Sequence, residues 1–226
     1  MGIEKELDYQ FSNKYILKDA VTHKSFYHEN PDDDGFHNER LEFLGDTILG
    51  LVISDLLYRK EPPFSEAQMA RIKSYIVSGS VLSDIANSIK LGEHLHLGKG
   101  EIETGGREKE SILADCLEAL FGAVFVDGGF AEAQKVVLRL YEDIVEETLE
   151  KKTYIDQKTE LQELSQRKYG VLPVYRIVSE EGLEHEKDFT VSVSINNEVL
   201  GTGTGPSKKK AEMEAAGEAM SKINND

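Results

Sequence analysis

Two strongly apolar segments of the chain each contain a pair of carboxylic acids at helical spacing. In residues 38–57 the acids are Glu42 and Asp46, and in residues 112–126 they are Asp115 and Glu118. Residues three or four positions apart share one face of an α-helix. Like charges at this spacing repel each other, and burying them without partners is unfavourable. A cation is therefore expected to meet each pair.

One divalent metal site could satisfy both pairs. Small residues in the second segment would let two helices approach closely; they are Ala114, Ala119 and Gly122. The four acids would then gather around one point and offer the oxygen ligands that suit Mg²⁺ or Mn²⁺. The alternative is a set of buried salt bridges, for which the candidate bases are Arg40, Arg71 and Lys73. Because the same pattern occurs twice, the metal site is favoured.

The elements that must position these acids are helices. Periodicity predicts helices over 17–27, 39–58, 65–76, 80–91, 111–126 and 130–151, with a loop over 98–107. Ser65 and Gln68 form a predicted capping box at the start of the third helix. Apolar residues surround helix 39–58 on almost every side, which predicts that it lies in the interior.

After residue 152 the pattern changes to helix, three strands and helix. We expect a helix over 157–168, strands over 174–179, 189–195 and 198–202, and a last helix over 207–223. Asn196 and Asn197 suit a tight hairpin turn between the second and third strands. The predicted class is α+β, with an all-helical domain at 1–150, a linker at 151–155 and a small α-β-β-β-α domain at 156–226.

The residues at the start of the last helix favour the binding of an anion. Ser207 is a predicted N-cap, and Lys208, Lys209 and Lys210 follow in the first turn. Positive charge is unfavourable at a helix N-terminus unless an anion such as phosphate binds there. The alternative is a solvated run of lysines on a surface helix.

Composition limits the remaining possibilities. The net charge of −16 gives no global basic surface, so any nucleic acid must be bound by local patches. The one cysteine, Cys116, cannot form an intrachain disulfide. We find no apolar run long enough for a membrane helix and no signal-peptide pattern at the N-terminus. A cytoplasmic protein without a membrane partner is expected.

Residues 38–46, Asn-Glu-Arg-Leu-Glu-Phe-Leu-Gly-Asp, resemble the signature of bacterial ribonuclease III. The resemblance extends to Thr-His-Lys-Ser at 22–25, to residues 107–123 and to Asp-Gly-Gly at 127–129. It implies an all-helical endonuclease domain in which Glu42, Asp46, Asp115 and Glu118 bind the catalytic metal. It also implies supporting catalytic roles for Glu39 and Glu66.

The activity implied by this resemblance is hydrolysis of phosphodiester bonds in double-stranded RNA by a metal-activated water. The family uses Mg²⁺, with Mn²⁺ as a substitute, and works as a homodimer. Its products carry 5′-phosphate and 3′-hydroxyl ends with two-nucleotide 3′ overhangs. Processing of rRNA and other structured precursors, and RNA turnover, are the expected roles.

Residues 156–163, His185 and residues 207–216 resemble a double-stranded-RNA-binding domain. The resemblance implies three contact regions on the duplex. The residues expected to contact RNA are Thr159, Gln162, Glu163, Gln166, His185, Ser207, Lys208 and Lys209. Two other hypotheses remain: a non-catalytic RNA-binding regulator, and an acidic helical protein whose carboxylates are structural.

Three other features carry weaker hypotheses. His94 and His96 lack a third ligand for a metal, and Cys116 is expected to pack in the core. His23 and Ser25 are two residues apart, a spacing that would place them on different faces of one helix. We therefore do not predict a nucleophile–base pair there.

Overall fold

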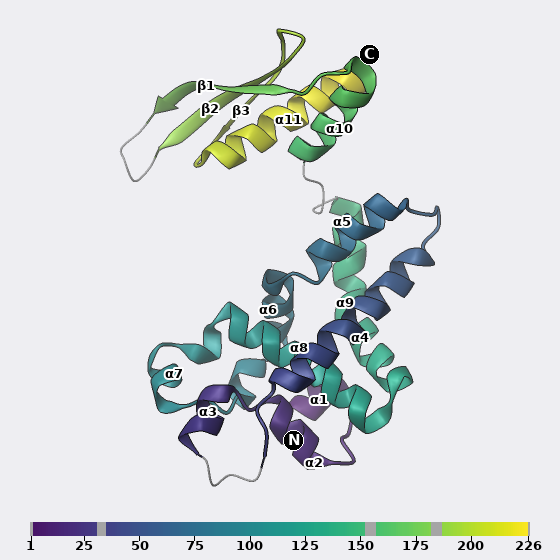
Figure 1. Ribbon diagram of the computed structural model, residues 1–226, viewed down its shortest axis with the longest axis vertical. Helices are drawn as coiled ribbons and strands as arrows, with labels where there is room; N and C mark the ends of the chain where they lie inside the picture. The colour runs from purple at the N-terminus through teal and green to yellow at the C-terminus, as the bar shows by residue number, and fades with distance from the viewer. Residues whose placement is uncertain (1, 31–34, 152–156, 182–186, 226) are drawn as a thin grey trace. The chain divides into compact units, whose positions relative to one another are not determined.

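The computed structural model describes residues 2–30, 35–151, 157–181 and 187–225. The chain forms two compact units, residues 1–154 and 155–226 (Figure 1). The first is helical and the second contains a three-stranded sheet, so the predicted α+β class is confirmed. Most of the predicted linker 151–155 lies outside the described residues, and the predicted bounds of the two domains stay predictions.

The helical unit is built around two long apolar helices, α4 (Glu39–Tyr58) and α8 (Glu110–Gly128). The other elements are α1 (Ile3–Leu7), α2 (Lys14–Ala20), α3 (Lys24–Glu29), α5 (Glu66–Ile76), α6 (Gly79–Ser88), η1 (Leu91–His94), α7 (Lys99–Glu103), η2 (Gly106–Glu108) and α9 (Phe130–Lys151). Helix α8 is buried along most of its length and contacts α2, α4, α6 and α9. No helix of the described residues is both long and apolar enough to cross a membrane.

Two predicted secondary-structure segments of this unit are wrong. Residues 17–27 form two helices, because Thr22 pairs with His96 and His23 caps the second helix through its ring nitrogen. Residues 98–107 contain helix α7 and a 3-10 turn instead of an open loop. The capping box of Ser65 and Gln68 is confirmed at the start of α5.

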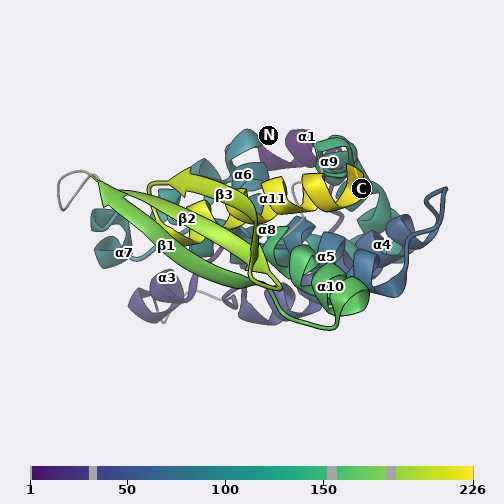
Figure 2. The ribbon, with the colours of Figure 1, turned by 90° about the horizontal axis from the view of Figure 1, so that it is seen from above.

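The second unit has the order α10 (Gln157–Tyr169), β1 (Val174–Glu181), β2 (Asp188–Ile195), β3 (Glu198–Gly205) and α11 (Lys208–Asn225). The strands form an antiparallel sheet in the order β1-β2-β3, with α11 against β2 and β3 and beside α10 (Figure 2). Asn196 and Asn197 both have positive φ, as the predicted hairpin turn requires.

Strand β3 is longer than the sequence predicts, because its glycines serve helix packing. A Cβ at Gly201 or Gly203 would collide with the backbone of Ala215 on α11. The glycine-rich segment therefore extends the strand and lets the helix lie close against the sheet. The helix and the buried strand residues then share one small core, which includes Leu161, Val193 and Ala219.

Candidate metal and RNA site

Helices α4 and α8 cross in direct backbone contact. A Cβ at Gly45 would overlap the carbonyl oxygen of Glu118, and one at Gly122 would overlap the carbonyl oxygen of Leu41. Gly122 was expected to permit a close approach, whereas the matching role of Gly45 was not predicted. This crossing brings the acid-bearing turns of the two helices together.

The crossing gathers three of the four predicted metal ligands. Carboxylate oxygens of Glu42, Asp115 and Glu118 lie within 4.8 Å of one another. Asp46 is one turn further along α4 and is exposed. Its charge nevertheless acts on Glu118 more strongly than any other charged side chain does. We call Glu42, Asp46, Asp115 and Glu118 the acidic cluster.

Burial and mutual repulsion disfavour the charged state of the acidic cluster. Burial, followed by the charges of Asp46, Glu42 and Asp115, raises the pKa of Glu118 to about 7. Burial is also the main cause that raises the pKa values of Glu42 and Asp115. Oxygen ligands whose negative charges no ion pair neutralises fit a hard divalent cation.

The salt-bridge alternative is contradicted. Among the described residues, no lysine or arginine forms an ion pair with any of the four acids. The guanidinium of Arg40 lies instead over the ring of Phe36, with its carbon 6.0 Å from the centroid. Lys73 lines a groove elsewhere on α4 and α5.

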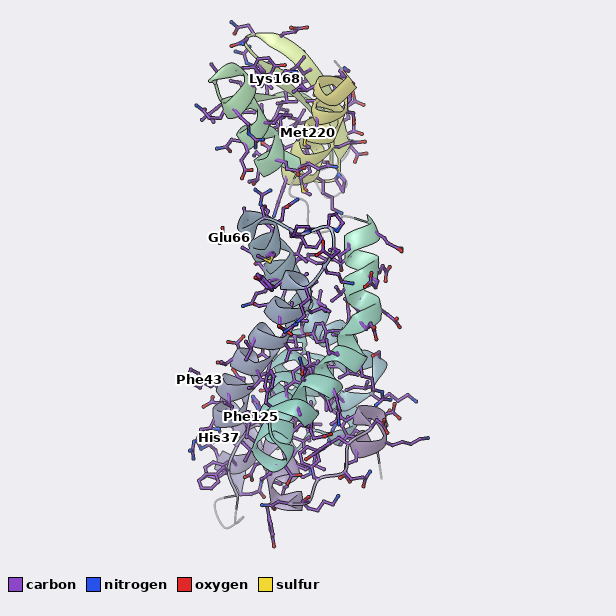
Figure 3. The ribbon with its side chains drawn as sticks, turned by 90° about the vertical axis from the view of Figure 1, so that its right-hand side faces the viewer. His37, Phe43, Glu66, Phe125, Lys168 and Met220 are labelled. Carbon is purple, nitrogen blue, oxygen red and sulfur yellow. The ribbon has the colours of Figure 1, made fainter. Side chains whose placement is uncertain are left out.

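The two predicted supporting acids occupy different places. Glu39 is one turn before Glu42, and its Oε1 accepts a hydrogen bond of 3.0 Å from Nζ of Lys24. Lys24 was not singled out by the sequence reasoning. Glu66 begins α5, well away from Phe43 along the helical unit (Figure 3). Within one chain, Glu66 therefore does not join the acidic cluster.

Helix α4 is not buried on all sides, so that prediction is wrong. Phe43, Leu51 and Tyr58 are 79%, 53% and 74% exposed on one side of the helix. Next to Leu51 and Tyr58, a groove of about 430 Å³ opens between α4 and α5. It is lined by Leu51, Ser54, Asp55, Leu57, Tyr58, Glu66, Met69, Ala70 and Lys73.

In the second unit, the predicted RNA contacts form two regions. The first is one exposed side of α10, with Thr159, Gln162, Glu163 and Gln166 at helical spacing. The second is the start of α11, and His185 lies outside the described residues.

Ser207 caps α11, as predicted, by accepting a hydrogen bond of 3.3 Å from the Lys210 amide. Lys208 and Lys209 are exposed in the first turn. The Nζ of Lys208 lies 3.4 Å from Oε1 of Glu180 and 5.5 Å from the ring centroid of Phe189. One acid of the domain, Glu180, therefore already pairs with one of the predicted phosphate-binding lysines.

The weaker candidates have structural roles. Cys116 is fully buried, and burial raises the pKa of its thiol, which disfavours a nucleophile. His23 and Ser25 do contact each other, contrary to the spacing argument, with 2.9 Å between Nδ1 and Oγ. Because His23 precedes α3 as its cap, helical spacing does not apply to it. The Ser25 hydroxyl also accepts a hydrogen bond from the Gly98 amide, which ties α3 to the residue just before α7.

Comparison with known proteins supplies the family. Residues 13–144 match the family model described as ribonuclease-III-like, and residues 157–223 match the double-stranded RNA binding motif. This chain belongs to the ribonuclease III family. Ribonuclease 3 of Syntrophotalea carbinolica is 42% identical, over 96% of this chain and 94% of that protein. Ribonuclease 3 of Carboxydothermus hydrogenoformans is 43% identical, over 100% and 96%.

A solved structure agrees with the family of the helical unit. The nuclease domain of ribonuclease III from Campylobacter jejuni is 39% identical, with a TM-score of 0.58. It aligns with 62% of this chain and 94% of that chain. With both domain types present, this ribonuclease III is an endoribonuclease that acts on double-stranded RNA.

Proposed function

We propose that the acidic cluster is the catalytic centre and that its carboxylates hold Mg²⁺, which Mn²⁺ can replace. The observation that carries this proposal is that carboxylate oxygens of Glu42, Asp115 and Glu118 lie within 4.8 Å of one another. No described lysine or arginine forms an ion pair with them. When bound, the divalent ion supplies an activated water and neutralises charge on the phosphate being cut. Asp46, on the rim of the same face, completes the set of ligands.

The part played by the protein is to bind the metal and to orient it. The α4–α8 crossing fixes Glu42 and Glu118 on opposing helices, so their relative position does not depend on a loop. The raised pKa of Glu118 means that metal binding must displace a proton from the cluster near neutral pH. Hydrolysis is expected to leave 5′-phosphate and 3′-hydroxyl ends, as in the family.

A homodimer explains the exposed side of α4. An isologous pair joins the same surface of two copies about a two-fold axis. If two α4 helices pair in opposite directions, Phe43 of one copy can fill the groove next to Tyr58 of the other. Apolar side chains this exposed, beside an apolar groove, favour such a contact. The Campylobacter jejuni nuclease domain is likewise described with a region involved in dimer formation.

The same pairing gives Glu66 a place at the catalytic centre. Glu66 lines the groove that Phe43 would fill, and Phe43 directly follows Glu42 on α4. The partner's Glu66 would therefore approach the acidic cluster from across the interface, while Glu39 supports it from the same chain. Two centres related by a two-fold axis would cut both strands, which accounts for staggered ends with two-nucleotide 3′ overhangs.

The second unit is proposed to bind double-stranded RNA by recognising the shape of the duplex. The side of α10 and the lysines that begin α11 would contact a minor groove and the backbone phosphates. Ser207, Lys208 and Lys209 present backbone amides and ammonium groups at one helix N-terminus. Processing of rRNA and other structured precursors in the cytoplasm is the cellular role we expect.

One assay separates this proposal from an RNA-binding regulator with the same fold. A long RNA duplex is incubated with the purified protein and Mg²⁺ at low salt, and the ends of the products are determined. We expect cutting that stops when EDTA is added, with 5′-phosphate ends and 3′ overhangs. Binding of the duplex without any cutting would support the regulator instead.

A further inference from the structure

Lys24 lies next to the acidic cluster, where it contacts Glu39. It is the first residue of α3, and its Nζ donates the 3.0 Å hydrogen bond to Glu39. Its charge also reaches Asp115 and Glu42. Burial, the largest influence, raises the pKa values of these two carboxyls, and the Lys24 ammonium opposes that rise. A basic side chain therefore stands beside a group of acids that must receive an anionic substrate.

The backbone holds Lys24 in this position. The Asn38 amide, just before α4, donates a hydrogen bond of 2.9 Å to the Thr22 carbonyl. The His23 amide donates one of 3.0 Å to the His96 carbonyl. Lys24 thus starts its helix from a segment that is tied both to the acid-bearing helix and to the loop after η1. Its Cα is fixed relative to the acidic cluster, while its side chain is 55% exposed.

A positive charge at this position would reduce the electrostatic repulsion between the acids and RNA. The acidic cluster and Glu39 together repel RNA phosphates, and bound metal offsets only part of that charge. An exposed ion pair between Lys24 and Glu39 contributes little to stability, so breaking it costs little. The ammonium group can then turn from the carboxylate to a phosphate oxygen.

We propose that Lys24 binds a backbone phosphate of the RNA strand that is cut, next to the scissile bond. Glu39 holds the ammonium group in place until the RNA arrives. This inference rests on the proposed function of the acidic cluster. It assigns a substrate-binding role to a residue that contributes no metal ligand.

The competing explanations predict different measurements. If Lys24 serves only to orient Glu39, replacing it should lower kcat and should have no further effect in a Glu39→Gln background. If the pair is an ordinary surface salt bridge, replacement should change nothing. A phosphate contact should act on KM and on the salt dependence, since each phosphate neutralised changes the slope against log salt by roughly 0.7–0.9.

The test compares Lys24→Met, Lys24→Gln and Lys24→Arg with Lys135→Met, which removes a similar exposed pair with Glu132 on α9. Steady-state cleavage of a duplex is measured with Mg²⁺ at several salt concentrations. Duplex affinity is measured separately in a Glu118→Gln background that cannot cut. We expect both neutral variants to raise KM and the dissociation constant about tenfold and to flatten the salt slope by roughly 0.7–0.9. Lys24→Arg should restore most of the loss, and Lys135→Met should match the wild type.

Each other outcome has a definite meaning. The proposal would be overturned if Lys24→Met and Lys24→Gln behaved like Lys135→Met in both assays. It would also be overturned if replacing Lys24 lowered kcat in the wild type but had no effect in a Glu39→Gln background. A wild-type protein that does not cut the duplex would contradict the proposed function. In that event, the affinity measurement alone decides whether Lys24 contacts RNA. Thermal unfolding of each variant shows that a change does not come from misfolding.

Discussion

The carbonyl oxygen of Glu118 occupies the space that a side chain on Gly45 would need. The same is true of the Leu41 carbonyl and Gly122, so two glycines set the spacing of α4 and α8. Under the proposed function, this spacing would allow Glu42 and Glu118, on different helices, to bind one ion. The geometry of the acidic cluster therefore depends on two glycines, which carry no functional group.

Gly45→Ala should separate the two helices and disperse the acidic cluster. We expect a loss of about 1–3 kcal/mol in the free energy of unfolding, as is typical of overpacking, and a fall in Mg²⁺ affinity. Gly50→Ala, on the same helix, is the control. Its Cβ would meet only the end of the Lys73 side chain, at 3.2 Å from Nζ and 3.5 Å from Cε. Denaturant unfolding and metal titration check both variants, and equal behaviour of the two would contradict the role given to Gly45.

Metal binding should depend on pH near neutrality. Burial and then its acidic neighbours raise the pKa of Glu118 to about 7, and only the deprotonated carboxylate is a ligand. Below that pH a proton competes with the ion, so affinity should fall as pH decreases. We expect roughly a tenfold weaker Mg²⁺ affinity at pH 6 than at pH 8. Calorimetric titration at both values measures this, and equal affinities would show that Glu118 does not exchange its proton for metal.

The sequence predicted which acids lie close together better than it predicted the structure around them. Helical spacing alone placed Glu42 near Asp46 and Asp115 near Glu118, and the small residues of α8 indicated the close crossing. The break before α3 was missed because it depends on the long-range pairing of Thr22 with His96. Local periodicity contains no information about such a contact.

The exposed side of α4 was missed for a different reason. An apolar side chain that packs against a second copy of the chain looks, in sequence, like one in the core. Phe43 was therefore expected to be buried, although it is 79% exposed in the single chain. The proposed dimer explains in the same way why Glu66 lies far from the acidic cluster of its own chain. The residues that Glu66 would approach across the interface belong to the other molecule.

Phe43→Asp should weaken the proposed dimer. A charge in place of the aromatic ring cannot enter an apolar groove without a large desolvation cost. Sedimentation equilibrium should show a monomer at concentrations where the wild type is dimeric. Tyr15→Asp is the control, since Tyr15 is a similarly exposed aromatic residue, 73% exposed, that belongs to α2 and not to α4. If Phe43→Asp remains dimeric, the interface lies elsewhere.

The start of α11 should contribute RNA affinity without sequence preference. Replacing both Lys208 and Lys209 by Ala should weaken binding equally for unrelated duplexes and flatten the salt dependence. Lys222→Ala, in the last turn of the same helix, removes one lysine paired with Glu218 and should have little effect. Affinity for two duplexes of different sequence at several salt concentrations distinguishes the outcomes. A loss confined to one sequence would argue against recognition of phosphates.

The acidic cluster is tested most directly by Glu118→Gln, with Glu110→Gln as a matched change in the first turn of the same helix. Mg²⁺ binding, duplex affinity and duplex cleavage are measured for both proteins. Our account predicts that Glu118→Gln abolishes cleavage and weakens Mg²⁺ binding while duplex affinity is retained, and that Glu110→Gln resembles the wild type. Cleavage and metal binding at wild-type levels in Glu118→Gln would contradict a catalytic metal centre at the α4–α8 crossing.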